Sequence, residues 1–121
     1  MTENSNGKAV LVVDDDPDFR ALVVAIGEFC KVPIFQACDC NQALDVLEQN
    51  GDSIKMILLD YFMPGMEPSQ CAAAVIAKAA PPIQVVLVTA AADPSARAAE
   101  LKIRRWLSKP FEASTLTKLI A

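Results

Sequence analysis

The sequence predicts an α/β fold built on a doubly wound parallel sheet, and three observations lead to this fold class. Five short apolar segments recur along the 121 residues, at positions 9–13, 33–37, 55–59, 83–88 and 104–108. The first, third and fourth are nearly unbroken apolar runs, which is typical of strands covered on both faces. Helical patterns separate the five segments, so strand and helix alternate, and right-handed crossovers between parallel strands are favoured.

The first helix is predicted over residues 17–30. Asp16 can accept a hydrogen bond as its N-cap, and the fixed φ of Pro17 suits the first helical position. Apolar side chains recur at spacings of three and four, namely Phe19, Leu22, Val23, Ile26 and Phe29.

The second helix should begin after Asp39, which can cap it, while Gln42 is placed to return a capping contact. The Asn50-Gly51 pair that follows should stop the helix. Its apolar positions, at Ala43, Leu44, Val46 and Leu47, would face the sheet.

Three further helices complete the pattern. A third is predicted from about residue 68 to 79, ended by Pro81-Pro82, because proline cannot continue a helix. Asp93-Pro94 opens a fourth helix, and residues 112–120 form the last one.

Length and composition describe one compact domain over residues 1–121, with a polar N-terminal tail at 1–7. Hydrophobic residues make up 53% of the chain and the mean hydropathy is +0.30, so a large core can be buried. The net charge of −4 argues against direct binding of nucleic acid. No apolar run is long enough to cross a bilayer and the start lacks a targeting pattern, so we expect a cytoplasmic location without membrane contact. The natural chain could continue past Ala121.

Four cysteines could suggest a disulfide or a zinc site, yet the chain has no histidine and no repeated CxxC spacing. Cys30 and Cys71 fall in predicted helices, where buried free thiols are the expected explanation. Cys38 and Cys40 fall in a predicted loop, where exposed thiols could oxidise.

Polar residues interrupt the apolar runs where strands end. Asp14 and Asp15 follow the first strand, Asp60 the third, Thr89 the fourth, and Lys109 the fifth. In open α/β sheets, ligands bind outside the carboxyl ends of the strands, where the strand order reverses. In a flavodoxin-like (βα)5 sheet of order 2-1-3-4-5, this point lies between the first and third strands, beside the acidic residues.

Three neighbouring carboxylates need compensation, because one pair 4 Å apart costs about 4 kcal/mol at an effective dielectric constant near 20. Protons, Lys109 or a divalent cation could supply it, and a site of oxygen ligands suits Mg²⁺. Adjacent strands lie about 4.8 Å apart, so Lys109 can reach toward an anion held at Asp60. A carboxylate beside a cation, an ammonium and the hydroxyl of Thr89 is suited to attack a phosphoryl donor.

Four motifs resemble those of the receiver domains of response regulators. They are LVVDDDP at 11–17, LLDYFMPGM at 58–66, LVTA at 87–90 and WLSKPF at 106–111, and together they extend over essentially the whole chain. The resemblance implies a receiver of two-component phosphorelay signalling, which takes a phosphoryl group from a sensor histidine kinase or phosphotransfer protein. A downstream protein or output domain would respond, and a homodimer through the fourth helix, fifth strand and fifth helix is possible in this family.

The resemblance also assigns the residues of the acidic edge. Asp60 would be phosphorylated. Asp15 and Asp60 would bind Mg²⁺ together with the backbone carbonyl of Phe62, with help from Asp14. Such a receiver is a Mg²⁺-dependent phosphoacceptor that promotes its own phosphorylation and slow dephosphorylation, and we do not expect it to be an enzyme.

The remaining assignments concern the response to phosphorylation. Thr89 and Lys109 would hold the phosphoryl oxygens, and the bond before Pro110 is usually cis in the family. Trp106 stands at the position of the switch aromatic, which would enter the space left when Thr89 moves toward the phosphate. Fixed packing of Trp106 is the alternative, because an indole is larger than the tyrosine or phenylalanine common there.

Several residues depart from the family pattern. Pro68 and Lys102 replace glycines that are common in receivers, which predicts a reshaped start of the third helix and a reshaped turn before the fifth strand. Phe62 and Ala91 stand at positions that influence how water reaches the phosphoryl group. Because neither side chain can position a water molecule, we hypothesise slow self-dephosphorylation.

Two other functions remain as alternatives. A binding module of receiver shape that signals without phosphorylation would tolerate the changes at Pro68, Lys102 and Trp106. A phosphatase of the haloacid dehalogenase type needs a second acid two residues after the nucleophile, and that position is Phe62.

Overall fold

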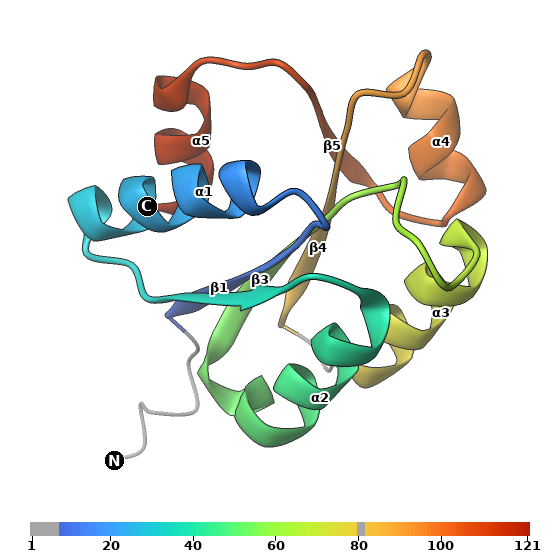
Figure 1. Ribbon diagram of the computed structural model, residues 1–121, viewed down its shortest axis with the longest axis horizontal. Helices are drawn as coiled ribbons and strands as arrows, with labels where there is room; N and C mark the ends of the chain where they lie inside the picture. Colours follow the sequence, from blue (N-terminus) through green and yellow to red (C-terminus); the bar gives the residue numbers. More distant parts are fainter. Residues whose placement is uncertain (1–7, 80–81) are drawn as a thin grey trace.

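A computed structural model describes residues 8–79 and 82–121 of the chain. Its centre is a parallel sheet of five strands in the order β2-β1-β3-β4-β5, which is the order predicted from the sequence. Figure 1 shows this sheet with helices on both faces. The strands are β1 (Ala9–Val13), β2 (Ile34–Ala37), β3 (Ile54–Leu59), β4 (Gln84–Thr89) and β5 (Arg105–Ser108). The predicted polar tail at 1–7 lies outside the described residues.

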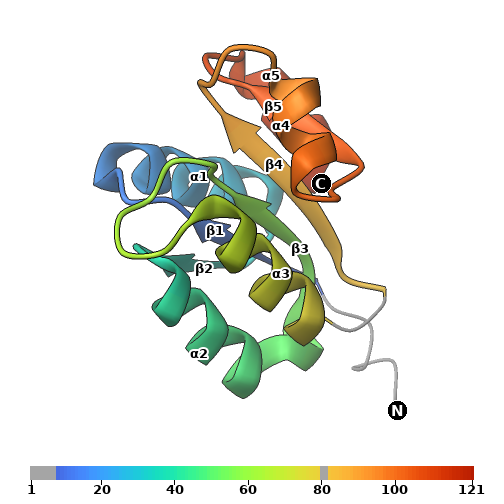
Figure 2. The same ribbon diagram turned by 90° about the vertical axis from the view of Figure 1, so that its right-hand side faces the viewer.

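Five α-helices connect and follow the strands. They are α1 (Pro17–Cys30), α2 (Cys40–Asn50), α3 (Pro68–Lys78), α4 (Pro94–Glu100) and α5 (Ala113–Ile120), and a short 3-10 turn (Gly51–Ser53) follows α2. Helices α1 and α5 cover one face of the sheet, whereas α2, α3 and α4 cover the other (Figures 1 and 2). Within the described residues, no helix combines the length and the apolar character needed to cross a bilayer.

The helix starts follow from local hydrogen bonds that the sequence predicted. The carboxylate of Asp16 accepts a hydrogen bond from the backbone N–H of Asp18 at 2.9 Å and caps α1. Asp39 caps α2 by accepting from the backbone N–H of Gln42 at 2.8 Å, and the side chain of Gln42 accepts from the backbone N–H of Cys38. Helix α3 ends at Lys78, and Pro81, which was predicted to help end it, lies outside the described residues.

Both faces of the central strands are buried, which explains their unbroken apolar runs. Strand β1 is buried along its whole length, because β2 and β3 flank it and helices cover both of its faces. Leu11, Ile57 and Leu87 face the α2-α3-α4 side. Val12 and Leu58 face the α1-α5 side. The strands β2 and β5 lie at the edges of the sheet and are more exposed.

The prediction for two cysteines is wrong. Cys40 is the buried first residue of α2 rather than an exposed loop residue, and it forms a disulfide with Cys71 of α3. The Cα atoms lie 5.9 Å apart because α2 and α3 pack side by side, a proximity that a sequence separation of 31 does not reveal. In the chain-entropy model a crosslink of this span stabilises the fold by about 3–4 kcal/mol relative to the reduced chain. Cys30 and Cys38 are partly buried free thiols.

Lys102 adopts the conformation that a glycine would provide. Its φ angle is 61°, in the left-handed region, so the turn before β5 keeps this conformation although the side chain is a lysine. Lys31, which ends α1, is the other exposed lysine with a left-handed backbone, at φ 60°. Pro68 occupies the first turn of α3, where a missing N–H has no cost.

We predict that Lys102→Gly stabilises the protein. A non-glycine residue in the left-handed region costs about 1–2 kcal/mol, of which the greater entropy of glycine in the unfolded chain offsets a part. We therefore expect the free energy of unfolding to rise by about 0.5–1 kcal/mol, measured by urea denaturation. Lys102→Ala, which removes the same side chain but keeps the strain, is the control. Equal stabilities of the glycine and alanine variants would contradict the explanation.

Candidate functional site

The sheet itself holds two acidic side chains next to each other at its carboxyl edge. The backbone N–H of Asp14 donates to the carbonyl of Ala37 on β2, and that of Asp60 donates to the carbonyl of Val13 on β1, both at 3.0 Å. These bonds extend the ladders by one residue beyond the ends of β1 and β3. Asp14 and Asp60 are therefore fixed by backbone pairing, and both are buried, with 1% and 9% of their surfaces exposed.

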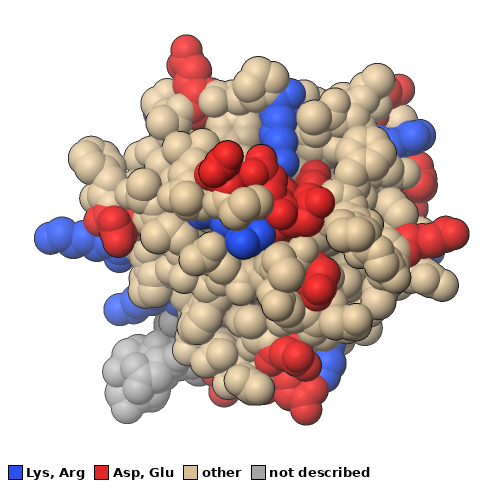
Figure 3. Space-filling model, in the orientation of Figure 1, with Lys and Arg blue, Asp and Glu red and all other residues tan. Residues whose placement is uncertain are grey.

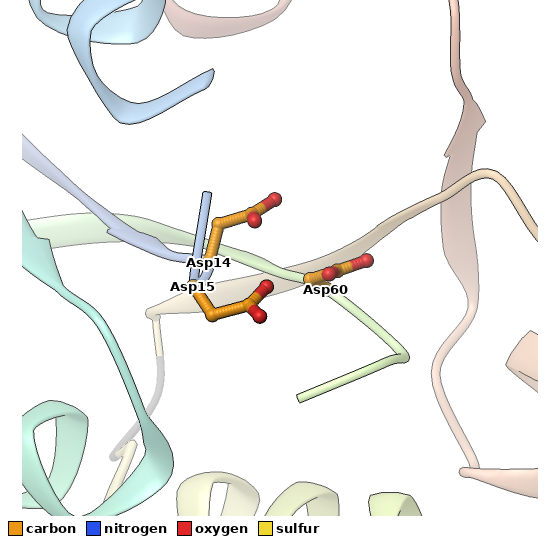
Figure 4. Close-up of side chains that lie close together, drawn as sticks. All are labelled: Asp14, Asp15 and Asp60. Carbon is orange, nitrogen blue, oxygen red and sulfur yellow. The ribbon is translucent and has the colours of Figure 1, made fainter. Parts of the chain in front are cut away.

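Asp15 completes an acidic cluster with these two residues. Asp14, Asp15 and Asp60 each offer a carboxylate oxygen such that all three oxygens lie within 4.8 Å of one another. In Figure 4 the three carboxylates extend in the same direction from the ends of their strands. Figure 3 shows that acidic side chains gather on this face of the molecule. Asp15 is exposed, so the cluster is open to solvent on one side.

Lys109 supplies the positive charge of the site. Its Nζ lies 2.6 Å from Oδ2 of Asp14 and 3.8 Å from Oδ1 of Asp60. The same Nζ lies 4.2 Å from the ring centroid of Phe19, a cation–π distance. The sequence predicted that Lys109 reaches toward Asp60, and the structure adds that Asp14 is its closer partner. The other carboxylate oxygen of Asp14 accepts from the backbone N–H of Asp16 at 2.9 Å.

Burial makes the carboxyl group of Asp60 a weaker acid than usual. Loss of solvent raises its pKa from 3.8 to about 6, and the negative charge of Asp14 acts in the same direction. The ammonium of Lys109 and the backbone N–H groups of Tyr61 and Phe62 lower the pKa, but they only partly compensate. The site therefore has an excess of negative charge that an additional cation would neutralise.

Thr89 and Lys109 are joined by the backbone at the same edge. Thr89 ends β4 and is completely buried, and its hydroxyl oxygen accepts a hydrogen bond from the backbone N–H of Ala91 at 3.0 Å. Its carbonyl accepts from the backbone N–H of Lys109 at 2.8 Å. The Lys109-Pro110 bond is cis, as the resemblance implied. The order of the strands thus brings Thr89 and Lys109 to the edge that carries Asp60.

The two aromatic residues singled out in the sequence, Phe62 and Trp106, both expose a large part of their surfaces. Phe62 follows Asp60 by two residues and exposes 57% of its surface. Trp106 pairs with Leu87 across β4 and β5, so by alternation it lies on the same face of the sheet as Thr89. It exposes 44% of its surface. The indole is therefore only partly packed and has room to change its position.

One contact near the site was not predicted. The hydroxyl of Tyr61, the residue after Asp60, donates to Oε2 of Glu100 in α4 at 2.9 Å. Arg97 forms an ion pair with the other oxygen of Glu100 at 3.2 Å and lies 5.9 Å from the ring centroid of Tyr61. This contact ties the loop after Asp60 to α4. No sequence signal could reveal it, because Tyr61 and Glu100 are 39 residues apart and neither is unusual for a surface position.

Comparison with known proteins agrees with this arrangement. A family model described as the response regulator receiver domain matches residues 10–121. Over 61 residues the chain is 36% identical to ARR21 of Arabidopsis thaliana, named as a two-component response regulator. That match covers 50% of this chain but only 10% of the plant protein, so the chain spans a small part of the length of this relative.

Solved structures share the fold over nearly the whole chain. The chemotaxis response regulator CheY4 of Vibrio cholerae has a TM-score of 0.81 and 24% identity, covering 95% of this chain and 97% of that one. The response regulator TrrA of Thermotoga maritima, solved in complex with Mg²⁺-BeF, has a TM-score of 0.79 and 23% identity. The match to TrrA covers 93% of this chain and 96% of that one.

At such identities the structural likeness shows the fold alone, whereas the family model matches the amino-acid sequence and therefore shows the family. The match extends from β1 to the last residue and includes both acidic strand ends. The chain therefore belongs to the response regulator receiver domains of two-component signalling.

Proposed function

We propose that Asp60 accepts a phosphoryl group from a sensor histidine kinase or a phosphotransfer protein in the cytoplasm. The observation that carries this proposal is the buried carboxylate of Asp60, held at the end of a central strand beside two further carboxylates and the ammonium of Lys109. A nucleophile needs a fixed position and nearby positive charge where the phosphoryl oxygens arrive. Both conditions are met without a histidine in the chain.

The acidic cluster fits Mg²⁺, the cofactor that the fold family implies. Its donors are oxygens only, they converge within 4.8 Å, and one side of the cluster is open, as Mg²⁺ requires in order to keep several waters. Burial and the negative charge of Asp14 together raise the pKa of Asp60, and a bound cation would favour its ionised form. We propose Asp14, Asp15, Asp60 and the backbone carbonyl of Phe62 as the residues that hold the ion. When bound, it would offset charge on the phosphoryl oxygens.

The residues of the chain then have distinct tasks in the transfer. A carboxylate oxygen of Asp60 forms a bond to phosphorus as the bond from phosphorus to the donor histidine nitrogen breaks. Lys109 and the hydroxyl of Thr89 stabilise the charge on the equatorial oxygens. For this, Thr89 must turn its hydroxyl from the backbone N–H of Ala91 toward the phosphoryl group.

Rotation of the Thr89 side chain would affect the surface that binds the downstream partner. Trp106 lies on the same face of the sheet and is partly exposed, so the space that Thr89 leaves can admit the indole. Such a change would alter the surface formed by α4, β5 and α5, where a downstream protein or output domain would bind. The alternative, a binding module that acts without phosphorylation, predicts that the acidic edge is chemically inert.

Incubation with acetyl phosphate and Mg²⁺ tests the proposal. We expect the intact mass to increase by one phosphoryl group and the emission of Trp106, the single tryptophan, to change. Asp60→Asn should gain no mass, because the amide cannot act as the nucleophile. Asp16→Asn is the matched control, because Asp16 caps α1 and lies outside the cluster. An unchanged mass of the unmodified sequence in Mg²⁺ would favour the inert binding module.

The titration of Asp60 should appear in the stability of the metal-free protein. Because its pKa is about 6 when folded and 3.8 ordinarily, folding favours the protonated form, and stability is lost as the pH rises from about 4 to 6. Asp60→Asn should not lose stability in this way, because an amide does not titrate. With EDTA at pH 7.5 we expect the variant to be more stable by roughly 1–2 kcal/mol, a figure reduced for solvent screening, and the gap should shrink at pH 4.5. Urea denaturation at both pH values measures the difference in stability between the variant and the unmodified sequence. A difference that is the same at both pH values would contradict the assignment.

The lifetime of the phosphoryl group should depend on the aromatic side chain at position 62. Phe62 is exposed beside the site and cannot position a water molecule for attack on phosphorus. We expect Phe62→Asn to speed the loss of the phosphoryl group by about tenfold, measured from the decay of the phosphorylated mass after removal of the donor. Phe62→Leu, which keeps an apolar side chain, should change the rate little. Similar rates for the asparagine and leucine variants would contradict the role of Phe62.

A further inference from the structure

The charges of this acidic chain are distributed unevenly. Residues 1–100 contain six basic and fourteen acidic residues, a net charge of −8, whereas residues 101–121 contain five basic residues and one acidic residue, a net charge of +4. One of these five basic residues, Lys109, belongs to the site at Asp60. The other four lie on or beside β5 and α5, and we call them the basic β5 face: Lys102, Arg104, Arg105 and Lys118.

The four cations of the basic β5 face have no acidic partner among the described residues. Arg105 donates from Nη1 to the neutral side-chain oxygen of Gln84 at 2.6 Å, and Lys102, Arg104 and Arg105 are exposed. Glu112 is the one acidic residue after position 100, and it lies at the start of α5, three residues after Lys109. The face is therefore a patch of positive charge without compensation.

Two cavities flank the edge strand at this face, and both have apolar walls with basic rims. One, of about 490 Å³, is lined by Ile76, Val85 and Ile103, with Lys102, Arg104 and Arg105 around it. The other, of about 350 Å³, lies between β5 and α5, where Leu107 and Leu119 meet Arg105 and Lys118. Arg105 lines both cavities. Each could take one large apolar side chain from a ligand whose carboxylates face the cations.

The strand between the cavities offers a third element of recognition. Among the residues that the structure describes, β5 pairs only with β4, so the backbone groups on its outer side have no partner strand there. An extended segment laid along β5 could use these groups and place alternate side chains toward the cavities. Carboxylates in the same segment would meet the four cations.

Two other occupants fit the face less well. A symmetric dimer through α4, β5 and α5 would set the basic β5 face against its own copy, and like-charge contacts across an interface cost several kcal/mol. A nucleic acid would meet only four cations on a chain of net charge −4, and its phosphates would gain nothing from the apolar walls.

We propose that the basic β5 face docks an extended acidic segment of another protein, with apolar side chains seated beside Ile103 and Leu107. The cavity at Ile103 lies at the amino ends of β4 and β5, at the opposite end of the sheet from Asp60. Docking is therefore separate from phosphorylation, and only its control by the state of Asp60 rests on the proposed function.

Peptide binding tests the proposal directly. The probe is a fluorescein-labelled peptide of twelve residues with the repeat Glu-Glu-Leu-Leu, in which successive leucines point to opposite faces of the added strand. The readout is fluorescence anisotropy at low and high salt. We expect binding that weakens about tenfold in Arg104→Gln/Arg105→Gln and about threefold in Lys102→Gly. A peptide with serine in place of leucine should bind at least fivefold more weakly than the probe.

A pair of matched lysines controls for net charge. Lys31→Gly removes one positive charge from an exposed left-handed position on α1, as Lys102→Gly does on the basic β5 face. Both changes relieve the same backbone strain, so neither should lower stability. Lys31→Gly should leave the affinity unchanged within about 1.5-fold.

Four results would overturn the proposal. They are no binding of the probe at about 1 mM, equal weakening by Lys31→Gly and Lys102→Gly, tighter binding of a labelled single-stranded DNA of twelve nucleotides, and a dimer in sedimentation that the arginine changes abolish. Phosphorylation by acetyl phosphate is measured on the same variants and should match the unmodified sequence. Peptide binding without any mass gain would refute the proposed function alone.

Discussion

The site depends on the burial of two like charges at adjacent strand ends. Asp14 and Asp60 are fixed by backbone hydrogen bonds to neighbouring strands, so they cannot move apart to relieve their repulsion. Lys109 compensates because the hydrogen bond from its N–H to the carbonyl of Thr89 holds the end of β5 at the same edge. The sheet order is thus what brings the opposite charges together. The three carboxylates outnumber the ammonium of Lys109, so one more cation could bind. With that cation present, the site could also accept an anion.

The fold could be predicted well because its signals are local. The run from Ala9 to Val13 is buried on both faces and reads as an unbroken apolar strand, and Asp16 followed by Pro17 marks a helix start to the residue. The conformation of Lys102 was less predictable, because its left-handed backbone is imposed by the turn and not by the lysine. Contacts between distant elements, such as Cys40 with Cys71, leave no mark in a single sequence.

The candidate site followed from topology more than from any one motif. Once the strand order was inferred, the residues after β1, β3, β4 and β5 had to meet at one edge, and the structure places Asp14, Asp60, Thr89 and Lys109 there. What could not be inferred was the pairing within this edge. Distances of 2.6 Å and 3.8 Å decide which carboxylate Lys109 contacts, and such differences depend on side-chain geometry.

The disulfide between α2 and α3 makes the two sides of the sheet unequal in stiffness. It clamps the helices that cover β1 and β3, while α4 is seven residues long and buries only Ala98. Tyr61 connects the loop after Asp60 to this lightly anchored helix through Glu100. A displacement that begins at Asp60 is therefore resisted by the linked helices α2 and α3 but not by α4. Movement should consequently be largest in α4 and β5.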